Sequence, residues 1–69
     1  MEILGQRIRA LRKERRLTQH DMAEALGISF NSYCRYELNE REPDAPVIKA
    51  MSDYFNVSAD YLLGRTDSP

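Results

Sequence analysis

The side chains best suited to specific chemistry in this 69-residue sequence are hydrogen-bonding groups rather than catalytic ones. Asn31 and Arg35 lie four residues apart, and an amide and a guanidinium can each form two parallel hydrogen bonds with a flat polar partner. His20 is the only histidine and no nucleophile motif surrounds it, Cys34 is the only cysteine, and no phosphate-loop motif occurs, so no Ser/His/Asp arrangement, phosphate loop or metal cluster is available. We therefore expect a binding protein without a cofactor or metal, not an enzyme.

The charges are segregated along the chain. Six of the ten cations fall within ten residues, namely Arg7, Arg9, Arg12, Lys13, Arg15 and Arg16, where Glu14 is the one acid. Residues 17–69 carry four cations and nine acids. The net charge of −1 argues against a polyanionic partner, whereas the local basic run argues for one. Two interpretations of the run stay open, a nucleic-acid contact and a solvated helix face.

No apolar run approaches the roughly 20 residues needed to cross a bilayer, and the first residues lack the features of a secretion signal. A hydrophobic content of 42% with 30% charged residues is ordinary for a soluble domain. We therefore expect a cytoplasmic protein with no membrane partner.

A repeated pattern predicts three helix starts. An apolar residue, a Ser or Thr, and an apolar residue four positions after that hydroxyl recur at 17–22, 28–33 and 57–62. The hydroxyls of Thr18, Ser29 and Ser58 can cap the free N–H groups of a first turn, and the apolar pair can close over it. Helices are therefore expected to begin near residues 18, 29 and 58.

Residues that tolerate a left-handed backbone follow these helices, at Gly27, Asn39 and Gly64. Apolar spacings of three and four predict an earlier helix over about 4–15. Asp44 is the expected cap of a further helix that ends at Phe55. The sequence thus predicts an all-α fold of five helices in one domain, residues 1–69. The expected core residues are Leu4, Ile8, Leu11, Met22, Leu26, Ile28, Tyr33, Tyr36, Val47, Ile48, Met51 and Phe55.

The second and third helices are expected to meet at a sharp corner, because only Gly27, Ile28 and Ser29 separate them. Ala23 lies where the two axes would cross, and Gly27 can supply the positive φ of the turn. Residues 18–38 are therefore a candidate helix-turn-helix. Spacing alone leaves DNA binding and a purely structural helical hairpin as equal alternatives.

The stretch from Arg7 to Thr66 resembles the Cro/CI-type helix-turn-helix family, also called the xenobiotic response element family. The resemblance is carried by RIRALRKERRLTQ (7–19), MAEALGIS (22–29), RYE (35–37), REP (41–43) and DYFNVSADYLLGRTD (53–67). It implies a five-helix, lambda-repressor-like DNA-binding domain whose third helix enters the major groove. The implied function is sequence-specific binding of double-stranded DNA by a transcriptional regulator, such as a repressor or autoregulator.

One flank of the third helix is the candidate base-reading face. A helical wheel separates it from Tyr33, Tyr36 and Glu37 on the opposite side. The flank consists of Phe30, Asn31, Cys34, Arg35 and Leu38. Asn31 can pair with adenine, Arg35 with guanine, and Phe30 can lie against a thymine methyl. For Phe30, packing on the preceding turn or on a partner chain is an equal alternative.

Other residues are expected to hold the DNA backbone. The resemblance implies a phosphate contact at Gln19, and Thr18 lies at the same helix end, where the dipole favours anions. Ser32 and Arg41 are the further candidates for phosphate contacts. Such contacts fix the register of the protein on the duplex without reading its sequence. The lone His20 is expected to be an exposed neighbour of these anchors.

The resemblance also implies an ion pair between Arg12 and Glu37, which would orient the reading helix. A single module of this size reads few base pairs, so we expect a homodimer on a palindromic operator. Tyr61, Leu62 and Leu63 are the candidate dimer surface, and for Leu62 core packing is an equal alternative.

A second hypothesis from another class is a protein-binding module of the same fold, such as an antitoxin or an adaptor. Glu40 and Glu42 flank Arg41, so residues 28–42 carry a net charge of −1, which is acidic for a groove-facing segment. This acidity, together with the aromatic ring of Phe30, favours the protein-binding hypothesis.

Overall fold

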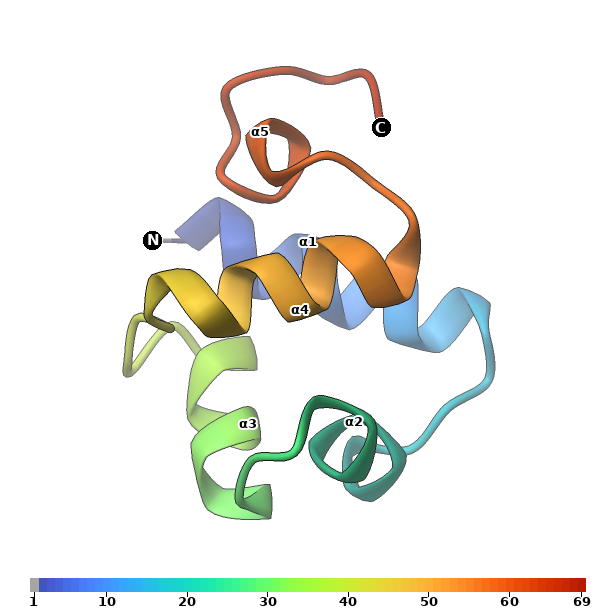
Figure 1. Ribbon diagram of the computed structural model, residues 1–69, viewed down its shortest axis with the longest axis vertical. Coiled ribbons are helices and arrows are strands. Elements are labelled where there is room, and N and C mark those ends of the chain that lie inside the picture. Colours follow the sequence, from blue (N-terminus) through green and yellow to red (C-terminus); the bar gives the residue numbers. More distant parts are fainter. Residues whose placement is uncertain (1) are drawn as a thin grey trace.

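The computed structural model describes residues 2–69, and within that range it consists of five helices without a strand (Figure 1). In chain order they are α1 (Glu2–Glu14), α2 (Gln19–Leu26), α3 (Phe30–Glu37), α4 (Ala45–Phe55) and α5 (Ala59–Leu62). The predicted all-α, five-helix architecture is confirmed. None of these helices has both the length and the apolar character that crossing a lipid bilayer requires.

The helices share one apolar core. α2 packs on α3 and α4, α1 contacts α3 and α5, and α4 contacts α5. Figure 1 shows α2 and α3 at one end of the molecule and α5 with the C-terminus at the other. The buried apolar residues are Leu4, Ile8, Leu11, Met22, Ala23, Tyr33, Tyr36, Met51, Phe55 and Leu62. Burial of each Leu, Ile, Met or Phe side chain in this core stabilises the fold by about 1.5–3 kcal/mol. Four residues predicted to be inward, Leu26, Ile28, Val47 and Ile48, are only partly buried and pack against this core.

The four predicted helix caps are confirmed. The side chains of Thr18, Ser29, Asp44 and Ser58 each accept a hydrogen bond from the backbone N–H three residues later, at 3.0–3.1 Å. At α2 the cap is reciprocal, because Asp21 accepts a hydrogen bond of 2.8 Å from the backbone N–H of Thr18. Local sequence therefore fixes where four of the five helices begin.

The predicted left-handed residues are also confirmed, with φ of 68° at Gly27, 60° at Asn39 and 80° at Gly64. Two more positive values, 56° at both Arg16 and Asn56, were not predicted. Asn56 carries a signal that could have found it, because asparagine enters this region readily and follows the last apolar residue of α4. Arg16 carries none, because arginine has no such preference.

Asn39 has a second role that sequence reasoning missed. Its Oδ1 accepts a hydrogen bond of 3.1 Å from the backbone N–H of Gly5. Gly5 lies in the first turn of α1, where backbone N–H groups lack partners within the helix. The contact is close enough that a Cβ at residue 5 would lie 2.5 Å from the same oxygen. The turn after α3 and the start of α1 are therefore fastened together, and residue 5 must be glycine for this fit.

Candidate nucleic-acid interface

The corner between α2 and α3 presents α3 at the edge of the molecule. Gly27 closes α2 in the left-handed conformation, and the backbone N–H of Ile28 donates to the carbonyl of Ala23 at 3.0 Å. Ala23 itself is buried, as expected for a small residue where two helices approach closely. The helix-turn-helix geometry predicted for residues 18–38 is thus present.

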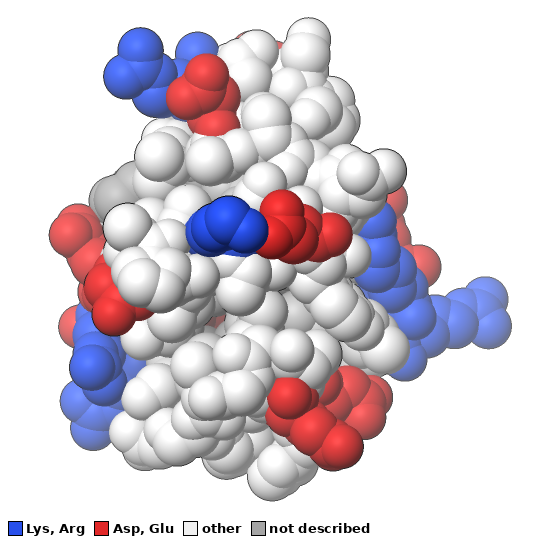
Figure 2. Space-filling model, viewed as in Figure 1, with Lys and Arg blue, Asp and Glu red and all other residues white. Residues whose placement is uncertain are grey.

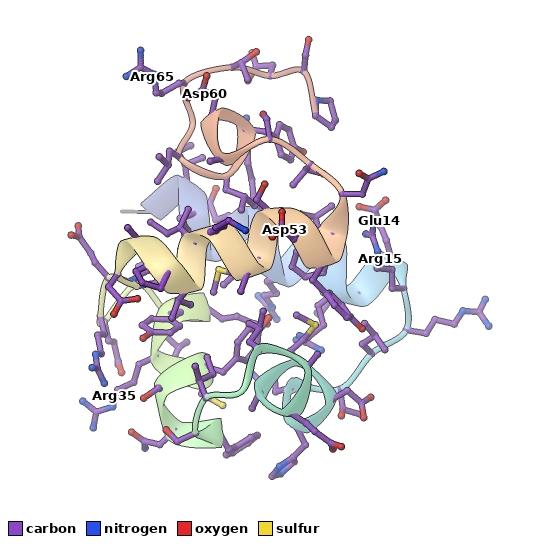
Figure 3. All side chains as sticks on the ribbon, viewed as in Figure 1. Glu14, Arg15, Arg35, Asp53, Asp60 and Arg65 are labelled. Atoms are coloured by element: carbon purple, nitrogen blue, oxygen red, sulfur yellow. The ribbon has the colours of Figure 1, made fainter. Side chains whose placement is uncertain are left out.

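The two sides of α3 differ as the helical wheel predicted. Tyr33, Tyr36 and Glu37 are buried. On the other flank Asn31 and Arg35 are exposed, and Leu38, the residue that ends the helix, has 65% of its surface exposed. Cys34, between them, is half-buried and free of disulfide bonding. Figure 3 shows Arg35 on the outer side of α3, pointing away from the other helices.

The ring of Phe30 stacks on the ring of His20, a contact that was not expected from the sequence. The two ring centroids are 3.8 Å apart and the planes differ by 10°. Phe30 nevertheless keeps 41% of its surface exposed. His20 is exposed, as expected, but it also holds an aromatic ring at the start of α3. No sequence signal pairs these residues, since they lie on different helices.

The predicted ion pair between Arg12 and Glu37 is present and nearly enclosed. Arg12 donates from Nε to Oε2 at 2.6 Å and from Nη2 to Oε1 at 3.1 Å, with side-chain exposures of 12% for Arg12 and 3% for Glu37. A third arginine hydrogen bond, from Nη1 to the carbonyl of Leu17, measures 2.9 Å. The pair therefore joins α1, the turn after it and the last residue of α3.

Glu37 has two further donors. The hydroxyl of Tyr33 donates to Oε2, and Nε2 of Gln19 donates to Oε1 at 3.1 Å. Burial by itself raises the pKa of Glu37, but the hydrogen bonds from Arg12, Tyr33 and Gln19 outweigh it, so the pKa is lowered. The hydrogen bond to Glu37 raises the pKa of Arg12, and burial raises that of Tyr33. The carboxylate is therefore charged at neutral pH and fully engaged.

The predicted phosphate anchors fall into two groups. At the start of α2, Thr18 is exposed, whereas Gln19 is half-buried because its amide nitrogen is directed to Glu37. On the far side of α3, Nη1 of Arg41 lies 3.2 Å from Oγ of Ser32, and its guanidinium is 5.9 Å from the ring centre of Tyr36. The fold therefore brings Ser32 and Arg41 together, nine residues apart in sequence.

Half of the basic run over residues 7–16 serves the fold itself. Arg7 donates to the carbonyl oxygens of Tyr61 and Thr66 and to Asp67, and Arg15 donates to the carbonyl of Phe55 at 2.9 Å. Together with Arg12, these are three of the six cations. The basic run is therefore neither a solvated helix face over its whole length nor available as a whole for nucleic-acid contact. Arg9, Lys13 and Arg16 remain exposed.

The three candidate dimer residues have different surroundings. Leu62 is fully buried in the core, so core packing is the alternative that the structure supports, and Leu62 is no longer a surface candidate. Tyr61 is half-buried beneath the guanidinium of Arg7, which lies 4.0 Å from its ring centre. Leu63 is half-buried against the core.

The molecule carries no strongly basic face in the orientation of Figure 2, where acidic and basic groups lie side by side and cations gather at two opposite edges. In the part of the chain that the structure describes, no cluster of three or more His, Cys, Asp or Glu side chains is placed to hold a metal ion. The groups that α3 and its last turn expose are the amide of Asn31, the guanidinium of Arg35 and the apolar side chains of Phe30 and Leu38.

Comparison with known proteins gives consistent matches. A family model described as helix-turn-helix covers residues 8–62. The uncharacterized HTH-type transcriptional regulator YazB of Bacillus subtilis is 46% identical over 61 residues, which is 88% of each chain. The HTH-type transcriptional regulator ImmR of the same organism is 39% identical over 64 residues, 93% of this chain and 50% of ImmR.

A solved structure also matches this chain. The crystal structure of the c2 repressor of Salmonella phage P22, in complex with a synthetic operator, superposes with a TM-score of 0.83 at 32% identity and covers 90% of this chain and 94% of that chain. The chain spans only 50–57% of the length of three of the relatives it matches, the Bacillus subtilis regulators YobD, ImmR and YqaE. The repressor-type fold implied by the sequence is confirmed, and the chain belongs to the Cro/CI-type helix-turn-helix family.

Proposed function

We propose that this chain binds double-stranded DNA site-specifically and regulates transcription, as a repressor or autoregulator, with α3 in the major groove. The observation that carries the proposal is the division of α3 into a flank with exposed Asn31 and Arg35 and a flank locked by the ion pair of Arg12 and Glu37. The fold match to a repressor bound to its operator supports it.

Each exposed side chain of α3 has a distinct role in this proposal. Asn31 pairs with adenine and Arg35 with guanine, and each such pair discriminates against the wrong base by about 1–3 kcal/mol. Phe30 contacts a thymine methyl, with Cys34 and Leu38 lining the apolar remainder of the same face. The rigid support behind α3 matters, because base discrimination needs the side chains held in one geometry.

Two groups of residues hold the backbone of the duplex in this proposal. Thr18 and Gln19 meet a phosphate at the positive end of the α2 dipole. Ser32 and Arg41 meet the backbone across the groove, supported by the 3.2 Å contact between them. These contacts position α3 and carry no sequence information.

The active species is proposed to be a homodimer on a palindromic operator, with half-sites about one helical turn apart. Tyr61 and Leu63 stay as the candidate contact residues near the end of α5. The chain is proposed to act in the cytoplasm as a binding protein without catalytic activity, as its family of regulators suggests.

Selection of bound sequences from random duplex DNA tests the proposal directly. The expected result is enrichment of one motif with two-fold symmetry, retained when the selection is repeated at a higher salt concentration. Uniform recovery of all sequences at both salt concentrations would contradict site-specific binding.

A protein-binding role, as an antitoxin or adaptor, is the second candidate. The observation that favours it is the exposure of two large apolar side chains, Phe30 at 41% and Leu38 at 65%, beside the acidic segment 40–42. If the wild-type chain bound no DNA site-specifically while Leu38→Glu abolished its binding to a co-encoded protein, this second role would replace the first.

A further inference from the structure

We propose that a groove on α1 is an additional binding site for the phosphate backbone of duplex DNA. The α1 groove is an open hollow of about 340 Å³ lined by Gln6, Arg9, Ala10, Lys13 and Glu37. This inference rests on the proposed function and extends its contact surface beyond the helix-turn-helix.

The first argument is the charge that the fold leaves unused. Arg7, Arg12 and Arg15 are committed to contacts within the molecule. By contrast, neither Arg9 nor Lys13 forms a hydrogen bond or ion pair with any side chain among residues 3–69, and both are exposed. Two cations spaced four apart on a helix lie on the same side of it, so their charges add at the hollow.

The second argument is position. Glu37 ends α3 and forms the inner wall of the groove, so the groove borders the reading helix. Glu37 also accepts a hydrogen bond from Gln19, the first residue of α2 and a proposed phosphate anchor. A DNA strand whose phosphate is bound at Gln19, at the start of α2, therefore passes close to Arg9 and Lys13.

The carboxylate in the wall does not prevent anion binding. Its charge is balanced by Arg12 at 2.6 Å, and its two oxygens accept hydrogen bonds from Arg12, Tyr33 and Gln19. The uncompensated charges at the groove are those of Arg9 and Lys13. The groove is therefore electropositive where it opens to solvent.

The third argument is dimension. From Gln6 to Lys13 the helix rises about 10 Å, so Arg9 and Lys13 can each meet a different phosphate of the same DNA strand. Amide and cationic side chains along such a line suit a run of phosphate oxygens. Phosphate binding by Arg9 and Lys13 would also supply the positive charge that residues 28–42, the segment proposed to face the DNA major groove, lack.

The salt dependence of affinity tests this site. Dissociation constants of the whole chain for its selected duplex, and for an unrelated duplex, are measured at four or more KCl concentrations. Variants are Arg9→Ala, Lys13→Ala and the double variant. Lys49→Ala is the matched control, because Lys49 is an exposed cation that pairs with Asp53 on α4, away from the groove.

Each groove variant is expected to reduce the slope of log affinity against log salt by about 0.9, and the double variant by about 1.8. Affinity at low salt falls for both duplexes alike, because phosphate contacts carry no sequence information. The preferred motif and the melting temperature stay unchanged. The charge-conserving variants Arg9→Lys and Lys13→Arg retain the wild-type slope.

Two results would overturn the inference, and they differ from failure of the proposed function. A double variant with the slope of Lys49→Ala would show that the groove carries no phosphate. Weaker binding at an unchanged slope would show an indirect effect through the neighbouring ion pair. If the wild-type chain bound neither duplex, the proposed function itself would fail, and this site with it.

Discussion

Gln19 donates a hydrogen bond of 3.1 Å from its amide nitrogen to Oε1 of Glu37, which connects the first residue of α2 to the last residue of α3. Because Glu37 is also bound by Arg12 and Tyr33, three helices converge on one carboxylate. A proposed phosphate anchor and the orientation of the reading helix are therefore coupled through a single side chain.

Removal of that carboxylate is expected to destabilise the whole domain. Glu37→Ala leaves the guanidinium of Arg12 nearly enclosed without its partner, at a cost of about 3 kcal/mol. Thermal unfolding should show a clear fall in melting temperature, together with weaker operator binding. The control is Glu40→Ala, which removes an exposed glutamate three residues later. Equal melting temperatures for Glu37→Ala and wild type would contradict a structural role.

Stability is expected to fall on acidification because of the same group. The pKa of Glu37 is lower in the folded chain than its ordinary value, so the folded state binds fewer protons than the unfolded state. The stabilisation is therefore complete above the ordinary glutamate pKa of about 4.3 and is lost as the pH falls through the lowered value.

Urea unfolding of wild type and Glu37→Gln from pH 7 to pH 3 measures this contribution. The variant should lose less stability over that range than wild type does. A smaller loss of the same sign remains in both proteins, because the hydrogen bond with Thr18 also lowers the pKa of Asp21. Parallel curves for the two proteins would rule out Glu37 as a source of the acid sensitivity.

Base reading and backbone anchoring should separate by mutation. Arg35→Ala is expected to relax preference at one position of the motif by about 1–3 kcal/mol, because one bidentate pair is lost. Gln19→Ala and Arg41→Ala are expected to weaken all sequences by similar factors. Affinities for single-base variants of the operator distinguish the two patterns. Identical profiles for the arginine variants would show that the assigned roles are wrong.

The stacked rings of His20 and Phe30 should act together. Removing the imidazole frees the phenyl ring, which is otherwise held at a centroid distance of 3.8 Å. His20→Ala is therefore expected to reduce discrimination between thymine and uracil at the position that Phe30 reads, whereas His20→Phe restores it. Glu24→Ala, an exposed change one turn later on α2, is the matched control. If Phe30→Ala itself did not alter the response to uracil, Phe30 would not contact a thymine methyl.

Gly5 and Asn39 should behave as a coupled pair in stability measurements. Gly5→Ala places a Cβ 2.5 Å from Oδ1 of Asn39, so the amide must move and its hydrogen bond is lost, at a cost of about 1–2 kcal/mol. Adding Asn39→Gly removes the obstructing side chain and suits the φ of 60°. The double variant should recover part of the loss in urea unfolding. Strict additivity of the two changes would contradict a direct contact.

Local interactions explain how much of the fold could be predicted. The caps at Thr18, Ser29, Asp44 and Ser58 act over three residues, so each one is visible in the sequence and each one is present. Apolar spacing within one helix likewise identified the buried side of α3 and thereby its exposed flank. The pairing of Arg12 with Glu37 was found through the family resemblance, because no local pattern encodes a contact between residues 25 apart.

The sequence by itself determined the helices, their limits and the side of α3 that faces outward, because these depend on neighbours within one or two turns. Tertiary packing alone decided the contacts of Gln19 with Glu37, His20 with Phe30, and Arg7 with the carbonyls near the C-terminus. It also selected which cations of the basic run remain available for a ligand. The physical reason is that a long polar side chain takes whichever partner the packed helices bring within hydrogen-bond distance, and that partner lies elsewhere in the chain.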